Sequence, residues 1–176
     1  MEYFKRIREK YDFGVLFEVG PYNRFKCGKR VELTGEKVSP HTLIDKQNLM
    51  EKVSSQVNNL IEKEFHNSEY MVLLKFEELA EEMSYTLESV MLNLGVVEYH
   101  VIETASYEDI DNELFSFLFL IDVTNCEFQK IIRAFLARHI DLEPYVMAEL
   151  FIVSKDLSKY ANLYDDRGMD FIELEK

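Results

Sequence analysis

The chain has 176 residues, 47% of them hydrophobic, with two cysteines and a formal net charge of −13. This length and apolar content suit one folded domain and exclude a disordered chain or a disulfide scaffold. The acidic balance argues against nucleic acid or an anionic membrane as a partner, because both need clustered lysine and arginine.

The N-terminal fifth combines charged and aromatic residues. Residues 1–11 (MEYFKRIREKY) predict a short helix and carry no apolar run, so we expect no signal peptide and a cytoplasmic location. The next segment, Phe13–Val19 (FGVLFEV), is rich in Phe and Val and predicts a strand that ends at Gly20 and Pro21. The basic segment Tyr22–Val38 fits an exposed hairpin or a long loop.

A long amphipathic segment follows. Thr42–Phe65 predicts a helix, with Thr42 and Asp45 as its start signal. Its apolar residues recur at intervals of three and four, which indicates one buried stripe: Leu49, Met50, Val53, Val57, Leu60, Ile61 and Phe65. Glu69–Phe76 predicts a strand, whereas Glu77–Leu94 is ambiguous: its first residues, EELAEEM, are typical of a helix, and Gly95 ends it.

The next part of the chain predicts two strands and a helix. Val96–Glu103 and Glu113–Val123 read as strands, separated by an acidic loop at Ser106–Asn112. The latter strand is too short and too polar to span a bilayer. Asn125–Ile140 is the clearest helix, and Thr124 with Glu127 fits a capping box. One stripe runs through Phe128, Ile131, Ile132, Phe135, Leu136 and His139, the last as a helix-end or half-buried residue, with Lys130, Arg133, Ala137 and Arg138 mainly opposite.

The C-terminal part predicts a strand at Tyr145–Val153 and a closing hairpin at Tyr160–Leu174. Strands joined by short turns, with two long helices between them, predict an α+β fold. We therefore expect a single domain over residues 1–176, in which an antiparallel or mixed sheet is backed by two long amphipathic helices.

The residue types that usually carry catalysis show no productive spacing. Gly20–Arg30 resembles a phosphate loop only superficially, because Asn23 stands where the first glycine is needed and Arg30 where Ser or Thr is needed, so a surface turn is expected. The four histidines have no metal-ligand spacing. Cys126 and His139 would lie at opposite ends of one helix, about 20 Å apart. No catalytic residue, metal or cofactor is expected.

The charge is concentrated in the central third. From Ser68 to Thr124 one lysine, Lys75, stands against thirteen carboxylates. Glu77, Glu78, Glu81 and Glu82 have helical spacing, which would stack like charges at a cost of a few tenths of a kcal/mol per pair. Such a cluster is usually a solvated face, but a basic partner is a second reason for it. With the loop residues Glu108, Asp109 and Asp111, these residues form the predicted partner-binding surface.

The most distinctive stretch is YDDRGMD, residues 164–170. It predicts a hairpin turn in which Asp165 or Asp166 accepts backbone N–H bonds and Gly168 adopts a positive φ. In the alternative, a ligand site, Asp165, Asp166 and Asp170 would gather around Arg167 or around a cation.

This turn, with the strand AELFIVSKDLSKYANL before it, resembles the closing hairpin of an uncharacterised bacterial family, domain of unknown function 3885. Phe17–Gly20 (FEVG), the long helix and the segment IDVTNCEFQKIIRAF are also similar to that family in order. The resemblance implies a small cytoplasmic bacterial protein and carries no catalytic residue with it. By analogy, small acidic domains of this kind are often immunity partners of toxins.

Three functional hypotheses follow. The first is a non-enzymatic binding protein, such as an immunity or antitoxin protein that covers a basic toxin domain with its acidic face. The second is a metal-dependent enzyme or ligand-binding domain that uses the YDDRGMD turn, for example on a phosphate ester. The third is a structural or regulatory subunit. The partner's identity and the oligomeric state do not follow from the sequence.

Overall fold

The computed structural model describes residues 3–17, 22, 25, 27–33, 42–66, 68–79, 87–109 and 114–174. The helices are α1 (Tyr3–Arg8), α2 (Phe13–Leu16), α3 (Leu43–Glu64), α4 (Leu87–Asn93) and α5 (Asn125–His139). The strands are β1 (Gly28–Glu32), β2 (Tyr70–Leu79), β3 (Tyr99–Asp109), β4 (Leu114–Val123), β5 (Glu149–Ser154), β6 (Lys159–Leu163) and β7 (Gly168–Glu173).

The strands form one antiparallel sheet. Over the described residues it has seven strands in the order β1-β7-β6-β5-β2-β4-β3, and every neighbouring pair is antiparallel. The α+β class and the antiparallel sheet predicted from the sequence are therefore confirmed. The closing hairpin is also confirmed as β6 and β7, and its second arm pairs with β1 from the basic segment. Gly28 to Arg30 thus belong to a strand, where a surface turn was predicted.

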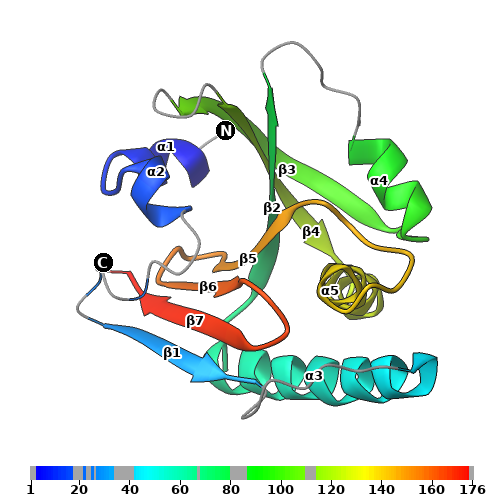
Figure 1. The fold of residues 1–176 in the computed structure, drawn as a ribbon. Helices are drawn as coiled ribbons and strands as arrows, with labels where there is room; N and C mark the ends of the chain where they lie inside the picture. The colour runs from blue at the N-terminus through cyan, green and yellow to red at the C-terminus, as the bar shows by residue number, and fades with distance from the viewer. Residues whose placement is uncertain are drawn as a thin grey trace.

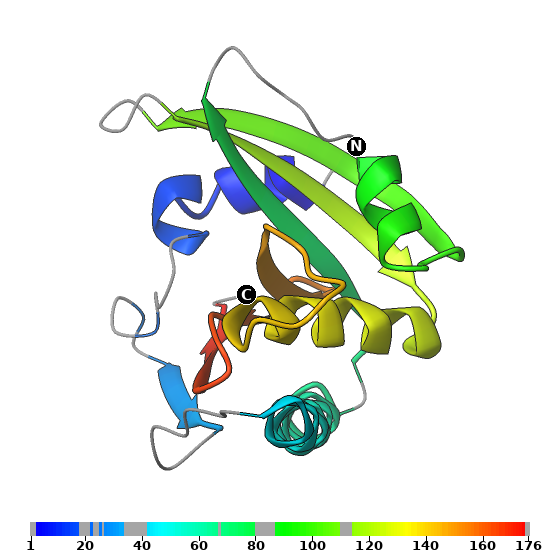
Figure 2. The ribbon, with the colours of Figure 1, turned by 45° about the vertical axis from the view of Figure 1, so that its right-hand side comes forward.

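The two long helices cover one face of the sheet, as Figures 1 and 2 show. α3 turns Leu49, Val53, Val57 and Ile61 into this core, which confirms the stripe read from the sequence. α5 contributes Phe128, Ile131, Ile132, Phe135 and Leu136, all buried. α4 adds Leu87 and Met91 to the same apolar cluster.

The opposite face is covered by α1, the short helix that the sequence predicted, and by α2, which it did not predict. Phe4, Ile7, Phe13, Leu16 and Phe17 pack there against apolar side chains of the central strands. α1 is also attached to the edge strand β3, because the buried Glu103 carboxylate accepts hydrogen bonds from the backbone N–H groups of Tyr3 (2.8 Å) and Phe4 (3.2 Å). Both faces of the sheet are therefore buried.

The prediction of a strand at Phe13–Val19 is wrong for its described part. Asp12 caps a short helix instead, with its Oδ1 accepting from the N–H groups of Gly14 (2.7 Å) and Val15 (3.3 Å). Phe13, Leu16 and Phe17 follow helical spacing and are all buried. Residues 18–20 lie outside the described residues.

Several strand boundaries also differ from prediction, among them the start of β3, which lies at Tyr99 instead of Val96. β2 continues through Glu77 and Glu78, where a helix was expected, and β3 continues to Asp109 through part of the expected acidic loop. Both extensions pair with β4, so the sheet's hydrogen bonds override the weak strand propensity of Glu and Asp. β5 starts only at Glu149, and Tyr145 to Ala148 precede it as irregular chain.

The caps of the long helices match prediction except in one detail. Thr42 and Asp45 form a reciprocal capping box on α3. Thr124 caps α5 by accepting from the N–H of Glu127, but the Glu127 carboxylate accepts from Val97 instead of completing the box. Ala137, predicted on the open face of α5, is buried. No helix within the described ranges is long and apolar enough to cross a membrane.

Candidate functional site

The strands bring four of the predicted partner-binding residues to one end of the sheet. Glu78 of β2 and Glu108 of β3 both pair with Phe115 of β4, and Glu77 and Asp109 are their chain neighbours. We call Glu77, Glu78, Glu108 and Asp109 the acidic strand end. Glu81, Glu82 and Asp111 lie outside the described residues, in the segments that continue from it.

The helical stacking predicted for Glu77 and Glu78 is wrong. They are consecutive residues of a strand, so their positions belong to opposite faces of the sheet. The Glu77 carboxylate forms an ion pair with the ammonium group of Lys75 at 2.5 Å. Glu108 is exposed. The four positions therefore share one end of the sheet without forming a helix face.

Lys75 is a buried charge that the sequence analysis did not single out. Its side chain lies 3.0 Å from Glu149 Oε2 as well as beside Glu77, and it donates to the carbonyl of Phe17 at 3.2 Å. Burial by itself would lower the pKa of Lys75, but the two carboxylates raise it above its ordinary value. Burial also raises the pKa of Glu149. We call Lys75, Glu77 and Glu149 the Lys75 triad, and its formal charge is −1.

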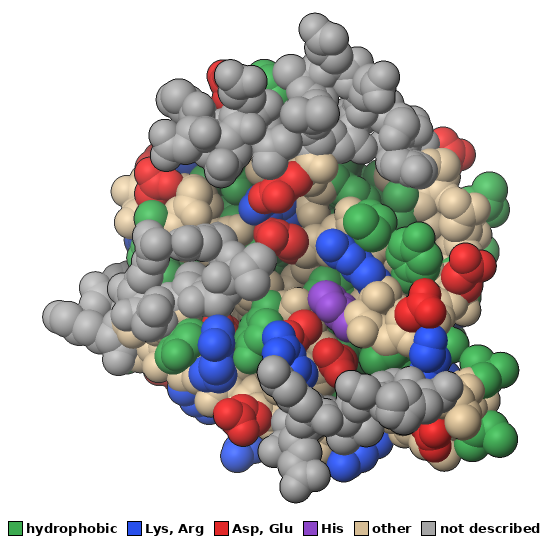
Figure 3. Space-filling model, in the orientation of Figure 1, with side chains coloured by type: hydrophobic (Ala, Val, Ile, Leu, Met, Phe, Trp, Pro, Cys, Tyr) green, Lys and Arg blue, Asp and Glu red, His purple; other side chains and the backbone are tan. Residues whose placement is uncertain are grey.

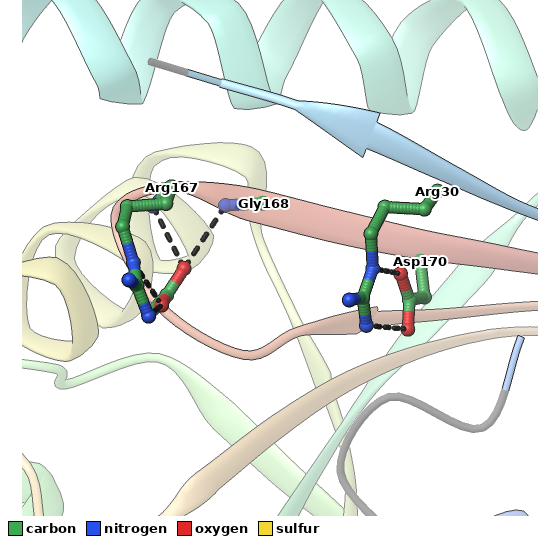
Figure 4. A network of polar contacts seen from close by, with 5 residues as sticks. Arg30, Arg167, Gly168 and Asp170 are labelled. Atoms are coloured by element: carbon green, nitrogen blue, oxygen red, sulfur yellow. Dashed lines mark hydrogen bonds and ion pairs between the residues drawn. The ribbon is translucent and has the colours of Figure 1, made fainter. Parts of the chain in front are cut away.

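The predicted turn has the polar geometry expected of a structural hairpin connection. Asp165 Oδ1 accepts from the N–H groups of Arg167 (2.8 Å) and Gly168 (3.0 Å), as predicted. Its Oδ2 pairs with the guanidinium of Arg167 at 2.6 and 2.7 Å, which raises the pKa of Arg167 (Figure 4). Asp165 therefore accepts hydrogen bonds both from backbone N–H groups of the turn and from the side chain of Arg167 in the same turn.

The prediction of a positive φ at Gly168 is wrong, since Gly95 is the one glycine of the described chain with a positive φ. Gly168 is required for a steric reason. A Cβ at this position would lie 1.6 Å from the hydroxyl oxygen and 2.3 Å from Cζ of Tyr164. The glycine lets the Tyr164 ring lie directly against the backbone of β7.

Asp170 does not gather around Arg167, as the ligand-site alternative expected. It forms a two-point ion pair with Arg30 of β1, at 2.8 and 3.0 Å, while its own side chain is fully buried (Figure 4). The Arg30 guanidinium also lies between two aromatic rings, 4.2 Å from the centre of Tyr22 and 4.5 Å from that of Tyr164. This arrangement raises the pKa of Arg30 and fixes β1 to the closing hairpin.

Two of the three aspartates of YDDRGMD are thus committed to arginines. Asp166 is half-buried. Its burial is the main cause that raises its pKa, and the negative charge of Asp165 raises it further. Within the described ranges, no three His, Cys, Asp or Glu side chains are placed to hold a metal ion. Asp165 and Asp170 thus connect the turn, the hairpin and β1 through their arginine partners.

The remaining candidates for chemistry are scattered. Cys27 and Cys126 are both exposed free thiols. His66 follows the end of α3. His139 ends α5 with its ring 5.1 Å from that of Phe135, and its partial burial lowers its pKa. The sequence did not predict the roles of Arg30 and Glu149, because their partners are distant in sequence. Lys75, a lone lysine inside the apolar run YMVLLKF, is a usable signal for a buried charge.

The comparisons with known proteins give one match. A family model described as "Domain of unknown function (DUF3885)" matches residues 5–176. No curated protein and no solved structure matches the chain.

Proposed function

The chain belongs to the DUF3885 family, for which no activity is described, and we propose that it is a protein-binding module. In this proposal the acidic strand end and the two segments that continue from it dock a basic protein. A basic toxin domain neutralised by an immunity or antitoxin protein is the form of this function that we propose. The protein would then act without catalysis, by covering its partner.

One observation carries the proposal. β2 and β3 end beside the start of β4, with Leu79 and Asp109 both paired to Leu114. The two segments that leave the sheet there, 80–86 and 110–113, add further acidic residues to the strand end. Seven carboxylates belong to this region in the sequence: Glu78, Glu81, Glu82, Glu108, Asp109, Asp111 and Glu113.

Other carboxylates of the central third have partners inside the molecule. Glu69 and Asp122 both pair with Lys155, at 3.1 and 3.0 Å. Glu103 is buried against the start of α1, and Glu77 is paired with Lys75. No lysine or arginine occurs in the sequence between Lys75 and Lys130. Glu88 and Glu98 are exposed elsewhere, so seven of the thirteen carboxylates of the central third belong, by their place in the sequence, to this end of the sheet and the segments that continue from it.

Such a surface acts mainly on the rate of association. Exposed like charges supply a field that attracts a basic partner, with rate constants up to about 10⁸ M⁻¹s⁻¹ at low salt. The reach of this field shortens to about 8 Å near physiological ionic strength. The ends of β2, β3 and β4 also project beyond α3 and α5 in Figures 1 and 2, so these helices leave that end open.

The test is a comparative affinity capture from the native host. Tagged wild-type protein is compared with the double variant Glu78→Lys/Glu108→Lys, and with Glu62→Lys, an exposed charge reversal on α3. The retained protein is identified by mass spectrometry, and its association rate is then measured by stopped flow at several salt concentrations. We expect a basic protein that wild type and Glu62→Lys retain in stoichiometric amount.

The double variant should associate at least about tenfold more slowly and with weaker salt dependence, while its melting temperature is no lower than that of wild type. An acidic partner would contradict the proposal. So would equal capture and equal association rates for all three proteins, because the strand end would then contribute nothing to recognition.

A further inference from the structure

A small cavity lies at the junction of three elements. It has a volume of about 130 Å³ and lies where α5 ends, β5 begins and β6 ends. Its polar lining includes Arg138, His139, Glu149 and Tyr164, and its apolar lining includes Phe135 and Leu163. Side chains of both charges and a histidine gather in the middle of the face that Figure 3 shows.

The positive side of this cavity is the guanidinium of Arg138. Among the described residues, no hydrogen bond or ion pair involves it, although Arg138 acts electrostatically on both His139 and Glu149. The three other arginines nearby or on the same helix each have a carboxylate partner: Arg30 has Asp170, Arg167 has Asp165 and Arg133 has Glu51. Arg138 is therefore a cation without a partner at the edge of a cavity.

The negative side of the cavity is the Lys75 triad. Glu149 lines the cavity, and its carboxylate shares the one ammonium group of Lys75 with Glu77. The triad therefore keeps a formal charge of −1, on which Arg138 acts electrostatically without an ion pair among the described contacts. Asp166 acts on His139 but does not line the cavity. The lining thus carries charges of opposite sign, which act on each other through space without forming an ion pair among the described contacts.

We propose that this cavity binds a small zwitterion of the amino-acid class. The carboxylate of the ligand pairs with Arg138, which can offer two parallel N–H donors, and its ammonium group lies toward Glu149. Phe135 and Leu163 accept a small apolar side chain. The Tyr164 hydroxyl and the His139 imidazole, both in the lining, add neutral hydrogen-bonding groups. A simple anion would meet Glu149, and a simple cation would meet Arg138, so each would leave one charge of the cavity unbalanced.

The test uses three probes of nearly equal size: L-alanine, propionate, which lacks the ammonium group, and ethylamine, which lacks the carboxylate. Each is titrated into the full chain in a buffer free of amines and carboxylates, and amide shifts are followed by ¹H–¹⁵N NMR. We expect L-alanine to produce saturable shifts at residues 135–139, 148–149 and 162–164. Propionate and ethylamine should bind at least about tenfold more weakly, because each loses a charge-assisted hydrogen bond.

Two variants locate the site. Arg138→Gln removes the exposed cation without disturbing a described contact, and it should weaken L-alanine binding at least about tenfold. Arg133→Gln, an exposed arginine on the same helix that does not line the cavity, is the matched control and should bind as wild type does. Propionate binding as tightly as L-alanine would overturn the proposal. Equal losses in the two variants, or no shift around the cavity with any probe, would also overturn it.

Discussion

Gly168 shows how one residue can be required for a reason that its sequence context does not reveal. The order Asp-Asp-Arg-Gly predicts a glycine with positive φ, whereas the structure needs the absence of a Cβ beneath the Tyr164 ring. Tyr164 cannot easily withdraw, because its other contact is the stacked guanidinium of Arg30. The glycine therefore belongs to the clamp that joins β1, the turn and β7.

We predict that Gly168→Ala destabilises the protein by about 1–3 kcal/mol through overpacking. Urea denaturation of Gly168→Ala, Tyr164→Ala and the double variant measures the coupling between the two positions. The penalty of Gly168→Ala should shrink to a few tenths of a kcal/mol once Tyr164 is alanine, because the new methyl group then has room. An equal penalty in both backgrounds would place the cost in the backbone of Gly168 instead.

At the scale of elements, prediction from the sequence succeeded where local signals were strong. α3 and α5 have long stripes at helical spacing and capping residues at their N-termini, so their existence and their buried faces could be read directly. β4 and the closing hairpin were bounded by turn residues. The four-residue α2 and the five-residue β1 could not be predicted from the sequence, because each is stabilised by contacts with distant segments. For the candidate sites, the acidic residues were visible in the sequence, while the partners of Arg30, Lys75 and Arg138 depend on tertiary contacts.

The helical state of α2 gives a test at this scale. Asp12 caps it through two backbone N–H groups, so Asp12→Ala should destabilise the protein by about 1 kcal/mol, whereas Asp12→Asn should cost much less. Chemical denaturation gives the stability, and amide hydrogen exchange at Gly14 and Val15 reports the loss locally. If this segment were the strand that its sequence suggests, both substitutions would be nearly neutral and exchange at these amides would not change.

For the whole molecule, the charge distribution sets a cost that folding must offset. The chain carries a net charge of −13, and seven carboxylates, without a lysine or arginine among them in the sequence, belong to the acidic strand end and the two segments that continue from it along the chain. Folding brings the ends of β2 and β3 together beside β4, which shortens the distances between these like charges. The sequence between Lys75 and Lys130 supplies no lysine or arginine to offset these charges, although Arg8 of α1 donates to the carbonyl of Ser106 on β3 at 3.2 Å. A segment with so many carboxylates and no cation of its own fits a surface kept for a basic partner.

This repulsion predicts that the isolated protein gains stability as salt is added. Raising KCl from about 10 to 300 mM shortens the Debye length from roughly 30 Å to less than 10 Å and screens the strand end. Because neighbouring like charges each cost a few tenths of a kcal/mol, we expect a total gain of about 1–2 kcal/mol in the free energy of unfolding, measured by urea denaturation.

Glu78→Lys/Glu108→Lys should begin more stable at low salt and gain less from KCl, whereas Glu62→Lys, a reversal on α3 away from this end, should retain most of the wild-type salt dependence. Two results would contradict this prediction: a wild-type stability that does not change with KCl, or a salt dependence that is reduced equally in both variants. Either would mean that these carboxylates do not repel one another as a cluster. The electrostatic field required for docking a basic partner would then be missing.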